Sequence, residues 1–332
     1  MITVAILGGG FMGSAHAANY AGLGGRVRVK TVASRTSERA RRVAETVGAE
    51  LTSDLEAAIR DPDVDAVDIC LPTSLHRMFA ERALGAGKHV FLEKPIALCV
   101  EDADAIVASA ERSGKILMVG MVLRFWPEYV ELQRRMAARE LGRPIAVSTH
   151  RLSPPADWNG WMGDPAQSGG VPVDLLIHDF DQMNWLLGTP RTVAASEPAP
   201  GHLHALVEYD GAAAIGEGSM AMPRSYPFSS LIRVLGEEGV AEYSFSATPV
   251  EGEGNIGASA SARGLRLYPR KGDPATVPVE SADPWGPEIE EFVSCVEQGR
   301  HPEQGTGEQA TLALRASLAA NRSLETGRPE AV

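Results

Sequence analysis

A glycine-rich turn near the start of the chain constrains the fold more than any other feature. The segment Gly8-Gly9-Gly10-Phe11-Met12-Gly13 follows an apolar run, Ile2 to Leu7, and opens a helix-forming stretch. Glycines spaced as GxGxxG between a strand and a helix let the chain turn tightly and let backbone amides approach a pyrophosphate. We therefore predict a dinucleotide-binding turn made by Gly8, Gly10, Phe11, Met12 and Gly13. A glycine turn with a purely structural role is the alternative.

Length and composition limit the kind of protein that the chain can be. It has 332 residues, which is enough for roughly two domains of about 150 residues each. Hydrophobic residues make up 44% and charged residues 22%, as in globular proteins. The formal net charge of -12 repels phosphate backbones and anionic lipids, so nucleic acid and membrane surfaces are poor partners.

Neither a membrane span nor a secretory signal is evident. The longest apolar stretch, Ile116 to Leu123, falls far short of the roughly 20 residues that cross a bilayer. The N-terminus lacks the basic region of a secretory signal, and we expect a cytoplasmic protein. Three widely separated cysteines, Cys70, Cys99 and Cys295, fit neither a disulfide framework nor a metal knuckle, so reduced thiols are expected.

The order of apolar runs predicts two domains. Residues 1–122 alternate short apolar runs with helical patterns, which is the rhythm of an α/β Rossmann domain with a doubly wound parallel sheet. Residues 123–332 are expected to form an α+β domain on an open, mainly antiparallel sheet, because strand follows strand there without intervening helices. One amphipathic helix, Val173 to Leu187, precedes those strands. Residues 247–264 are small, polar and Gly-rich, and we interpret them as a mobile loop.

The end of the second strand normally supplies the side chain that contacts the adenosine ribose. Here it reads Ala33-Ser34-Arg35-Thr36, without a carboxylate to bind the 2′-hydroxyl of NAD. Ser34 and Arg35 could instead hold a 2′-phosphate through a hydroxyl and a guanidinium. NADP(H) is therefore the predicted cofactor, with NAD(H) possible. A solvated surface arginine is the alternative for Arg35.

Further polar residues follow the third and fourth apolar runs, Ala66 to Leu71 and His89 to Leu92. Leu71-Pro72-Thr73 and His76 follow one, and Glu93-Lys94-Pro95 ends the other. Ligands bind at the carboxyl ends of strands in open α/β sheets, so we assign Leu71, Pro72, Thr73, His76, Glu93 and Lys94 to the cofactor site. A surface lysine paired with Glu93 is the alternative for Lys94.

One face of the helix at 173–187 carries Asp174, His178 and Asp181. A carboxylate one turn before an imidazole can orient it and stabilise its protonated form, which suits an acid/base group. Taken alone, the same pattern also fits a surface ion pair or a helix-face network.

Together these motifs resemble the glucose-fructose oxidoreductase, inositol dehydrogenase and MocA (Gfo/Idh/MocA) family. The likeness rests on the N-terminal GxGxxG, the Pro72-x-x-x-His76 segment, Glu93-Lys94-Pro95, and Gly169-Gly170 followed by Asp174-x-x-x-His178-Asp179. It covers nearly the whole chain in the family's order. The resemblance implies that Lys94 lies beside the nicotinamide and acts with Asp174 and His178 as the catalytic group.

The resemblance also implies features around that group. A cis Lys94-Pro95 bond is frequent in the family, although a sequence cannot show the isomer. Arg124 matches a position near the mouth of the active site and is assigned to the cofactor site, with a structural salt bridge as the equal alternative. Trp158 and Trp161 could form a platform for a sugar ring, and anchoring of their loop is the other interpretation.

The expected reaction is hydride transfer between nicotinamide and a carbinol or carbonyl carbon of a sugar, cyclitol or related polyol. No metal is expected, because the Cys, His and Asp positions form no convincing ligand set. A homodimer or homotetramer through the C-terminal sheet is expected. Two alternatives are a glycosidase that uses NAD for transient oxidation and a nucleotide-binding regulator without catalysis, although retention of Lys94, Asp174 and His178 together argues against the regulator.

Overall fold

The chain folds into two compact units. The computed structural model describes residues 1–35, 38–155, 160–247, 260–279 and 283–332. Unit 1 consists of Met1–Phe125 and Ala282–Thr311, and unit 2 consists of Trp126–Ser281 and Leu312–Val332. The prediction assigned all residues after 122 to the second domain, whereas residues 282–311 complete unit 1. The reason is burial: helix α9 (Gly286–Gln298) places Ile289, Phe292 and Val293 in the core of unit 1.

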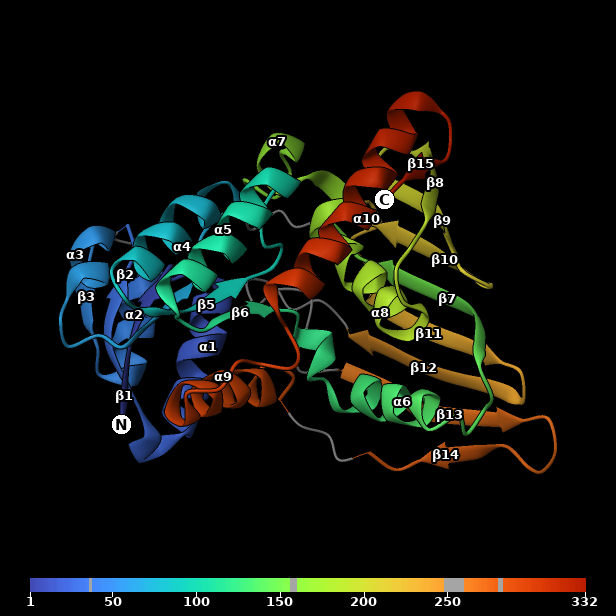
Figure 1. Ribbon diagram of the computed structural model, residues 1–332, viewed down its shortest axis with the longest axis horizontal. Helices are drawn as coiled ribbons and strands as arrows, with labels where there is room; N and C mark the ends of the chain where they lie inside the picture. Colours follow the sequence, from blue (N-terminus) through green and yellow to red (C-terminus); the bar gives the residue numbers. More distant parts are fainter. Residues whose placement is uncertain (36–37, 156–159, 248–259, 280–282) are drawn as a thin grey trace. The chain divides into compact units, whose positions relative to one another are not determined.

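A six-stranded parallel sheet forms the centre of unit 1, with strand order β3-β2-β1-β4-β5-β6 (Figure 1). The predicted doubly wound α/β fold is therefore confirmed. The order reverses between β1 and β4, which is the switch point where open sheets of this kind bind ligands. The strands are β1 (Ile2–Leu7), β2 (Val27–Ala33), β3 (Glu50–Thr52), β4 (Ala66–Ile69), β5 (His89–Glu93) and β6 (Leu117–Gly120).

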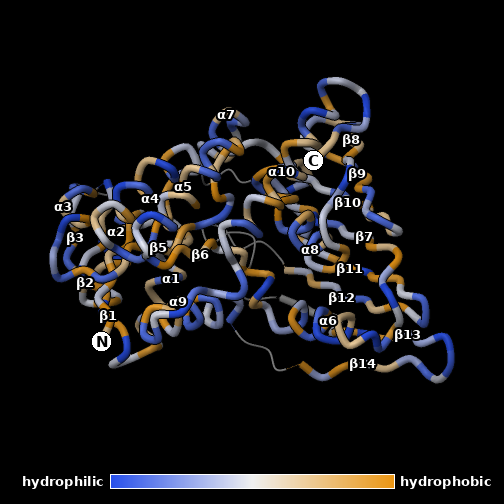
Figure 2. The backbone as a smooth tube through the Cα atoms, in the orientation of Figure 1, coloured by the Kyte–Doolittle hydropathy of each residue, from blue (hydrophilic) through white to orange (hydrophobic). Residues whose placement is uncertain are grey.

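Helices cover both faces of this sheet. On one face, α1 and α2 pack with α9 around the core residues Val4, Ile6, Phe91 and Phe292. On the other, α3, α4 and α5 pack on one another and on the strands. The alternation of hydrophilic and hydrophobic residues along the helices is visible in Figure 2, as expected for helices that bury one side. The bounds are α1 (Phe11–Gly22), α2 (Glu38–Val47), α3 (Leu55–Arg60), α4 (His76–Gly85) and α5 (Val100–Ser113).

Unit 2 is built on a nine-stranded sheet of order β14-β13-β12-β11-β7-β10-β9-β8-β15. Neighbouring strands are antiparallel except for β10 and β7, which agrees with the predicted mainly antiparallel sheet. The strands are β7 (Pro144–Leu152), β8 (Thr192–Ala199), β9 (His202–Tyr209), β10 (Ala212–Ser219), β11 (Phe228–Gly236), β12 (Gly239–Ala247), β13 (Ala260–Pro269), β14 (Ala275–Val277) and β15 (Glu330–Ala331). Of the segment predicted as a mobile loop, residues 248–259 lie outside the described residues.

One face of the large sheet is covered by α6 (Pro127–Ala137) and α8 (Ile177–Leu187), which Figure 1 shows on the same side of the strands. Burial alternates along β9 and β11, so that every second side chain points to the opposite, open face. The remaining helices are α7 (Pro165–Ser168) and α10 (Gly307–Thr326). None of the helices in the described part of the chain is long and apolar enough to cross a membrane.

Candidate active site

The glycines of the turn after β1 are of two kinds. At Gly8, Gly9 and Gly13 a side chain would collide with the chain, whereas at Gly10 there is room for one. A Cβ at Gly8, where φ is +113°, would lie 2.2 Å from the backbone oxygen of Cys70, and one at Gly13 would lie 2.0 Å from the oxygen of Gly8. A Cβ at Gly9 would meet Ala40 at 2.4 Å. A Cβ at Gly10, by contrast, would have no heavy atom of the described chain within 4 Å, apart from its own chain neighbours. The φ of Gly10 is an ordinary -81°.

Gly10 therefore has no reason within the chain itself to lack a side chain. It is the N-cap of α1, it makes no side-chain cap, and no acidic residue lies in the first turn of that helix. Backbone N–H groups at such a helix start can bind an anion, and the open surface over Gly10 leaves space for one. This is the geometry that the GxGxxG spacing predicts for a pyrophosphate site.

A buried hydroxyl lies four residues after the end of β4. Thr73 is only 3% exposed, and its hydroxyl has no hydrogen-bond partner among the described residues. Leu71 and Pro72, which precede it, are half-buried. A buried hydroxyl without a partner is unfavourable, so Thr73 is suited to a bound polar group. Together with Gly10, it makes the switch point of unit 1 fit a nucleotide.

His76 connects two strand ends rather than pointing out of the sheet. Its Nδ1 lies 2.8 Å from the carbonyl oxygen of Pro95, and its Nε2 lies 2.9 Å from that of Leu71. Burial lowers the pKa of His76, so the ring is the neutral form and donates to one of these carbonyls. One ring nitrogen of His76 thus donates to a backbone carbonyl beside the predicted cofactor site, and the other nitrogen faces the second carbonyl.

Two residues of the predicted ribose site follow β2, the half-buried Ser34 and the exposed Arg35. The backbone N–H of Ser34 donates to the oxygen of Thr52 at 2.9 Å, which fixes the end of the strand. The Ser34 hydroxyl lies 3.3 Å from the carbonyl of Arg35, and the Arg35 side chain is exposed to solvent. Residues 36–37 lie outside the described part of the chain.

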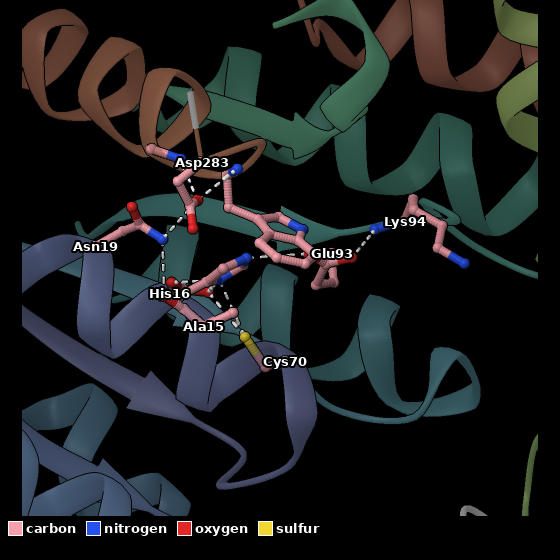
Figure 3. Close-up of polar contacts among 10 residues, drawn as sticks. Ala15, His16, Asn19, Cys70, Glu93, Lys94 and Asp283 are labelled. Atoms are coloured by element: carbon pink, nitrogen blue, oxygen red, sulfur yellow. Dashed lines mark hydrogen bonds and ion pairs between the residues drawn. The ribbon is translucent and has the colours of Figure 1, made fainter. Parts of the chain in front are cut away.

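Glu93 is the last residue of β5 and belongs to a buried polar network, shown in Figure 3, and Lys94 follows it. One Glu93 oxygen lies 3.2 Å from Nε2 of His16, and the other accepts the backbone N–H of Lys94 at 3.0 Å. The Lys94 side chain extends away from this network in Figure 3. The Lys94-Pro95 peptide bond is cis. The polar contacts of Glu93 are thus inside the protein, where they fix the backbone from which Lys94 projects.

The centre of this network is the imidazole of His16, which is fully buried. Its Nδ1 lies 2.9 Å from Asp68 and 3.3 Å from the sulfur of Cys70. Burial opposes a charge on His16, but the Asp68 carboxylate raises its pKa well above the ordinary value. His16 is therefore an imidazolium between two carboxylates, one at the end of β5 and one in the middle of β4.

Glu288 of α9 is the remaining acid beside this network. It is fully buried, and neither carboxyl oxygen has a hydrogen-bond partner among the described residues. Burial, followed by the charge of Glu93, raises the pKa of Glu288 well above its ordinary value. We infer that Glu288 is a neutral carboxylic acid at neutral pH, so that the imidazolium balances only Asp68 and Glu93.

The start of α9 packs against the helix that follows the glycine turn. The rings of Phe11 and Trp285 lie edge to face, with centroids 5.8 Å apart. Asp283 accepts the backbone N–H groups of Trp285 and Gly286. It also accepts the side-chain amide of Asn19 at 3.2 Å, as Figure 3 shows. Phe11 is therefore held by α9.

Arg124 contacts the same returning segment. Its side chain is 4% exposed and donates to the amide oxygen of Gln304 at 2.7 Å. The carbonyl of the next residue, Gly305, accepts the N–H of Val119 in β6. Arg124 thus joins the last strand of unit 1 to the segment at 282–311.

In unit 2, the segment with Asp174 and His178 is less regular than predicted. Residues Val171–Leu175 form a π-helical turn, and α8 begins only at Ile177. Asp174 is buried in the π turn and His178 is half-buried in the first turn of α8. Two left-handed glycines, Gly169 and Gly170, precede the turn, and π turns are frequent at functional sites. The i, i+4 argument assumed one continuous α-helix, so its geometry does not apply unchanged.

A buried ion pair and two glycines hold this segment against the sheet. Arg151 of β7 donates to Asp179 of α8 at 2.7 Å, with both side chains less than a tenth exposed. A Cβ at Gly218 of β10 would lie 2.5 Å from Leu176, and one at Gly216 would lie 3.1 Å from Met183. The close approach of α8 to β10 therefore requires small residues in that strand. Trp158, considered above as part of a sugar platform, lies outside the described residues.

Sequence reasoning missed His16, Asp68, Glu288 and the Arg151–Asp179 pair. A signal for the first two was present, since His16 lies on the same side of α1 as Gly13 and Tyr20, and Asp68 interrupts an apolar strand. Because buried charged groups are usually paired, a histidine and an acid at inward positions of neighbouring elements are expected to contact each other. Glu288 gave no comparable signal, because its helix was not expected in unit 1.

The chain is similar to known oxidoreductases over most of its length. A family model described as "Oxidoreductase family, NAD-binding Rossmann fold" matches residues 2–121, and one described as "GFO/IDH/MocA C-terminal domain" matches residues 129–242. The scyllo-inositol 2-dehydrogenase (NAD(+)) of Bacillus subtilis (strain 168) is 30% identical, with 99% of this chain and 95% of the relative aligned.

Two further relatives differ in cofactor and substrate. The D-xylose 1-dehydrogenase (NADP(+)) 2 of Haloferax volcanii is 30% identical over 89% of each chain. The crystal structure of the aldose-aldose oxidoreductase of Caulobacter crescentus, complexed with glycerol, superposes with a TM-score of 0.84 at 25% identity, covering 100% of this chain and 99% of that one.

Proposed function

The chain belongs to the GFO/IDH/MocA oxidoreductase family, and from this premise we propose that it transfers a hydride between a nicotinamide cofactor and a carbinol or carbonyl carbon of a sugar or cyclitol. The homologous enzymes are NAD(P)-dependent dehydrogenases and reductases of such substrates. The observation that carries the proposal is the turn at Gly10, where the chain leaves an open surface at a helix N-terminus.

We propose that the cofactor is held by the strand ends of unit 1. Gly8, Gly10, Phe11, Met12 and Gly13 would form the pyrophosphate turn, and Leu71, Pro72 and Thr73 would contact the cofactor beyond it. His76 and Glu93 contribute indirectly. His76 contacts the backbone of Leu71, and Glu93 contacts the backbone of Lys94 and the imidazole of His16. Arg124 contributes through its bond to Gln304, which ties the turn after β6 to the segment at 282–311. When bound, the nicotinamide supplies the hydride acceptor or donor.

The proton chemistry is assigned to three side chains of the protein. Oxidation of a carbinol releases one hydride and one proton, so a base must accept the hydroxyl proton. We propose that His178 exchanges this proton, that Asp174 orients His178, and that Lys94 polarises the oxygen and relays the proton. An imidazole is suited to this exchange near neutral pH.

The cofactor preference is proposed from the end of β2. Ser34 and the exposed Arg35 stand where NAD-dependent relatives of the fold often carry an acid. A guanidinium can donate two hydrogen bonds to a phosphate, and an acid would repel it. We therefore propose a preference for NADP(H), with NAD(H) as a weaker substrate.

The open face of the unit 2 sheet is proposed to join copies of the chain. Large apolar side chains are exposed on it, among them Leu206 of β9, Ile215 of β10 and Leu235 of β11, at 43%, 54% and 37%. The same face carries both Arg233 and Glu217, so it offers charges of both signs to a second copy. A homodimer or homotetramer would bury these side chains, and sedimentation equilibrium of the wild type against Ile215→Glu tests this proposal.

Nicotinamide absorbance provides the direct test of the reaction. The purified protein is assayed with inositols, aldoses and keto sugars, with NAD(H) and NADP(H), in both directions. Turnover of at least one polyol or sugar that depends on added or retained nicotinamide cofactor supports the proposal. Nucleotide binding without turnover of any substrate supports the regulator alternative, and sugar release without added cofactor supports the glycosidase alternative.

A further inference from the structure

Three of the eight histidines of the chain, His150, His202 and His204, lie on the open face of the unit 2 sheet, opposite the face that α8 covers. His202 and His204 occupy alternate positions of β9 and so point to the same face, while Leu203 and Ala205 between and after them are buried. Glu217 of β10 is the register partner of His204. Two imidazoles and one carboxylate therefore meet on adjacent strands.

The distances within this group suit a shared ligand. His202 Nε2 lies 3.1 Å from a Glu217 oxygen, and the two imidazole centroids are 5.2 Å apart. One potential ligand atom from each of the three residues lies within 4.8 Å of the others. In a tetrahedral site with bonds of about 2.0 to 2.2 Å, ligand atoms lie about 3.3 to 3.6 Å apart, so small rotations of exposed side chains suffice.

From this geometry we propose that His202, His204 and Glu217 form a binding site for a divalent transition-metal ion, with Zn²⁺ as the representative ligand. Two imidazoles and a carboxylate are a ligand set that zinc uses in proteins, with water in the fourth position. The ion pair with Glu217 uses only the imidazole of His202 and leaves that of His204 beside it. If both rings were protonated, two positive charges would lie next to each other. A metal ion instead binds a lone pair of each imidazole.

The neighbouring charges do not compete for Glu217. His150 of β7 is the register partner of Glu217 on its other side. Arg233 of β11 donates to Glu242 of β12 at 2.7 Å. The carboxylate of Glu217 is therefore available to a cation bound by the two histidines of β9.

The test is a Zn²⁺ titration of the untagged, chelator-treated full chain by calorimetry at pH 7.5. We expect one ion per chain, with affinity lowered at least tenfold in His204→Ala and in Glu217→Gln. His301→Ala, which removes an exposed histidine of unit 1, serves as the matched control and should leave the affinity unchanged. Circular dichroism of each variant establishes that the fold is retained.

A second metal probe tests the coordination directly. Co²⁺ bound by two imidazoles and a carboxylate in a four- or five-coordinate site gives strong visible absorption, which His202→Ala should abolish. The proposal fails if the wild type binds no Zn²⁺, or if the variants on β9 and β10 bind it as tightly as the wild type. It also fails if binding disappears in Cys70→Ser instead, because the ion would then occupy the buried group of His16, Asp68 and Cys70.

Discussion

The Nδ1 atom of His16 lies 2.9 Å from a carboxylate oxygen of Asp68, although the two residues are 52 positions apart in the chain. Helix α1 follows the glycine turn, and Thr73 follows β4 by four residues, so this pair links the two elements next to the proposed cofactor residues. Glu93 on the other side of the imidazole extends the same network to the backbone of Lys94.

His16→Gln should destabilise the protein by about 3 to 5 kcal/mol near pH 6, since it leaves two buried carboxylates without their cation. The pKa of His16 is raised in the folded state. Its stabilising effect is therefore complete below the unfolded-state pKa of about 6.5 and is lost as pH rises through the folded-state value. Urea unfolding at pH 6 and pH 9 measures this. An equal loss at both pH values contradicts an imidazolium, and His301→Gln is the control.

Glu288→Gln should stabilise the protein increasingly as pH rises from 5 to 7. The raised pKa of Glu288 means that the folded state keeps a proton that the unfolded state releases. That difference lowers the free energy of unfolding by about 1.4 kcal/mol per pH unit above the unfolded-state pKa of about 4.3, until the folded-state value is reached. Thermal unfolding of both proteins across this range is the measurement.

Glu290 provides a matched control for that experiment, because it lies on the same helix with its side chain 58% exposed. Glu290→Gln should change stability by less than about 0.5 kcal/mol at each pH. A gain from Glu288→Gln that does not depend on pH would show that Glu288 ionises normally in the folded state.

Gly10→Val should weaken NAD(P)H binding at least tenfold, which is about 1.4 kcal/mol, without loss of the fold. The new side chain occupies the open surface above the helix N-terminus and meets no atom of the chain. Fluorescence titration measures binding, and circular dichroism reports the fold. Gly22→Val, at the other end of α1 and equally unobstructed, should bind as the wild type does. Unchanged affinity in Gly10→Val would remove this turn from the site.

Lys94→Ala and His178→Ala should each lower kcat by about 10² to 10⁴, the usual contribution of a positioned acid or base. NAD(P)H affinity should change little, because neither side chain is proposed to hold the nucleotide tightly. Steady-state kinetics and cofactor titration separate the two effects. Near wild-type turnover of His178→Ala from pH 6 to 9 would assign the proton exchange to Lys94 instead.

Arg35→Ala should raise KM for NADP(H) much more than for NAD(H). A charge-assisted contact to the 2′-phosphate contributes about 1.5 to 3 kcal/mol, so the wild type should prefer NADP(H) by one to two powers of ten in kcat/KM. Equal kcat/KM for the two cofactors, or a preference for NAD(H), contradicts the assignment of Ser34 and Arg35 and leaves the oxidoreductase function intact.

The sequence predicted those elements that leave a local signature, such as a glycine spacing or an apolar periodicity. The glycine turn, the parallel strands of unit 1 and the mainly antiparallel sheet of unit 2 follow from spacing and periodicity. Strand β3 was missed because its three residues carry too little periodicity. The π turn at Val171–Leu175 was missed because a pattern of apolar residues does not distinguish a wide turn from an α-helical one.

Contacts between distant residues were harder to predict. His76 was assigned to the cofactor, yet its partners are the backbone carbonyls of Leu71 and Pro95, and backbone acceptors leave no mark in a sequence. The three candidate catalytic residues came from a family resemblance, since Lys94 and His178 lie in different units and no local pattern relates them.

The return of residues 282–311 to unit 1 has a consequence for synthesis of the chain on the ribosome. Translation proceeds from the N-terminus, so the first 125 residues emerge well before Phe292 and Val293 exist to cover Phe91 and Ile6. Until then one face of the nascent parallel sheet lacks part of its apolar covering. The nucleotide-binding unit, although first in the sequence, completes its core only after the whole large sheet up to β14 has been translated.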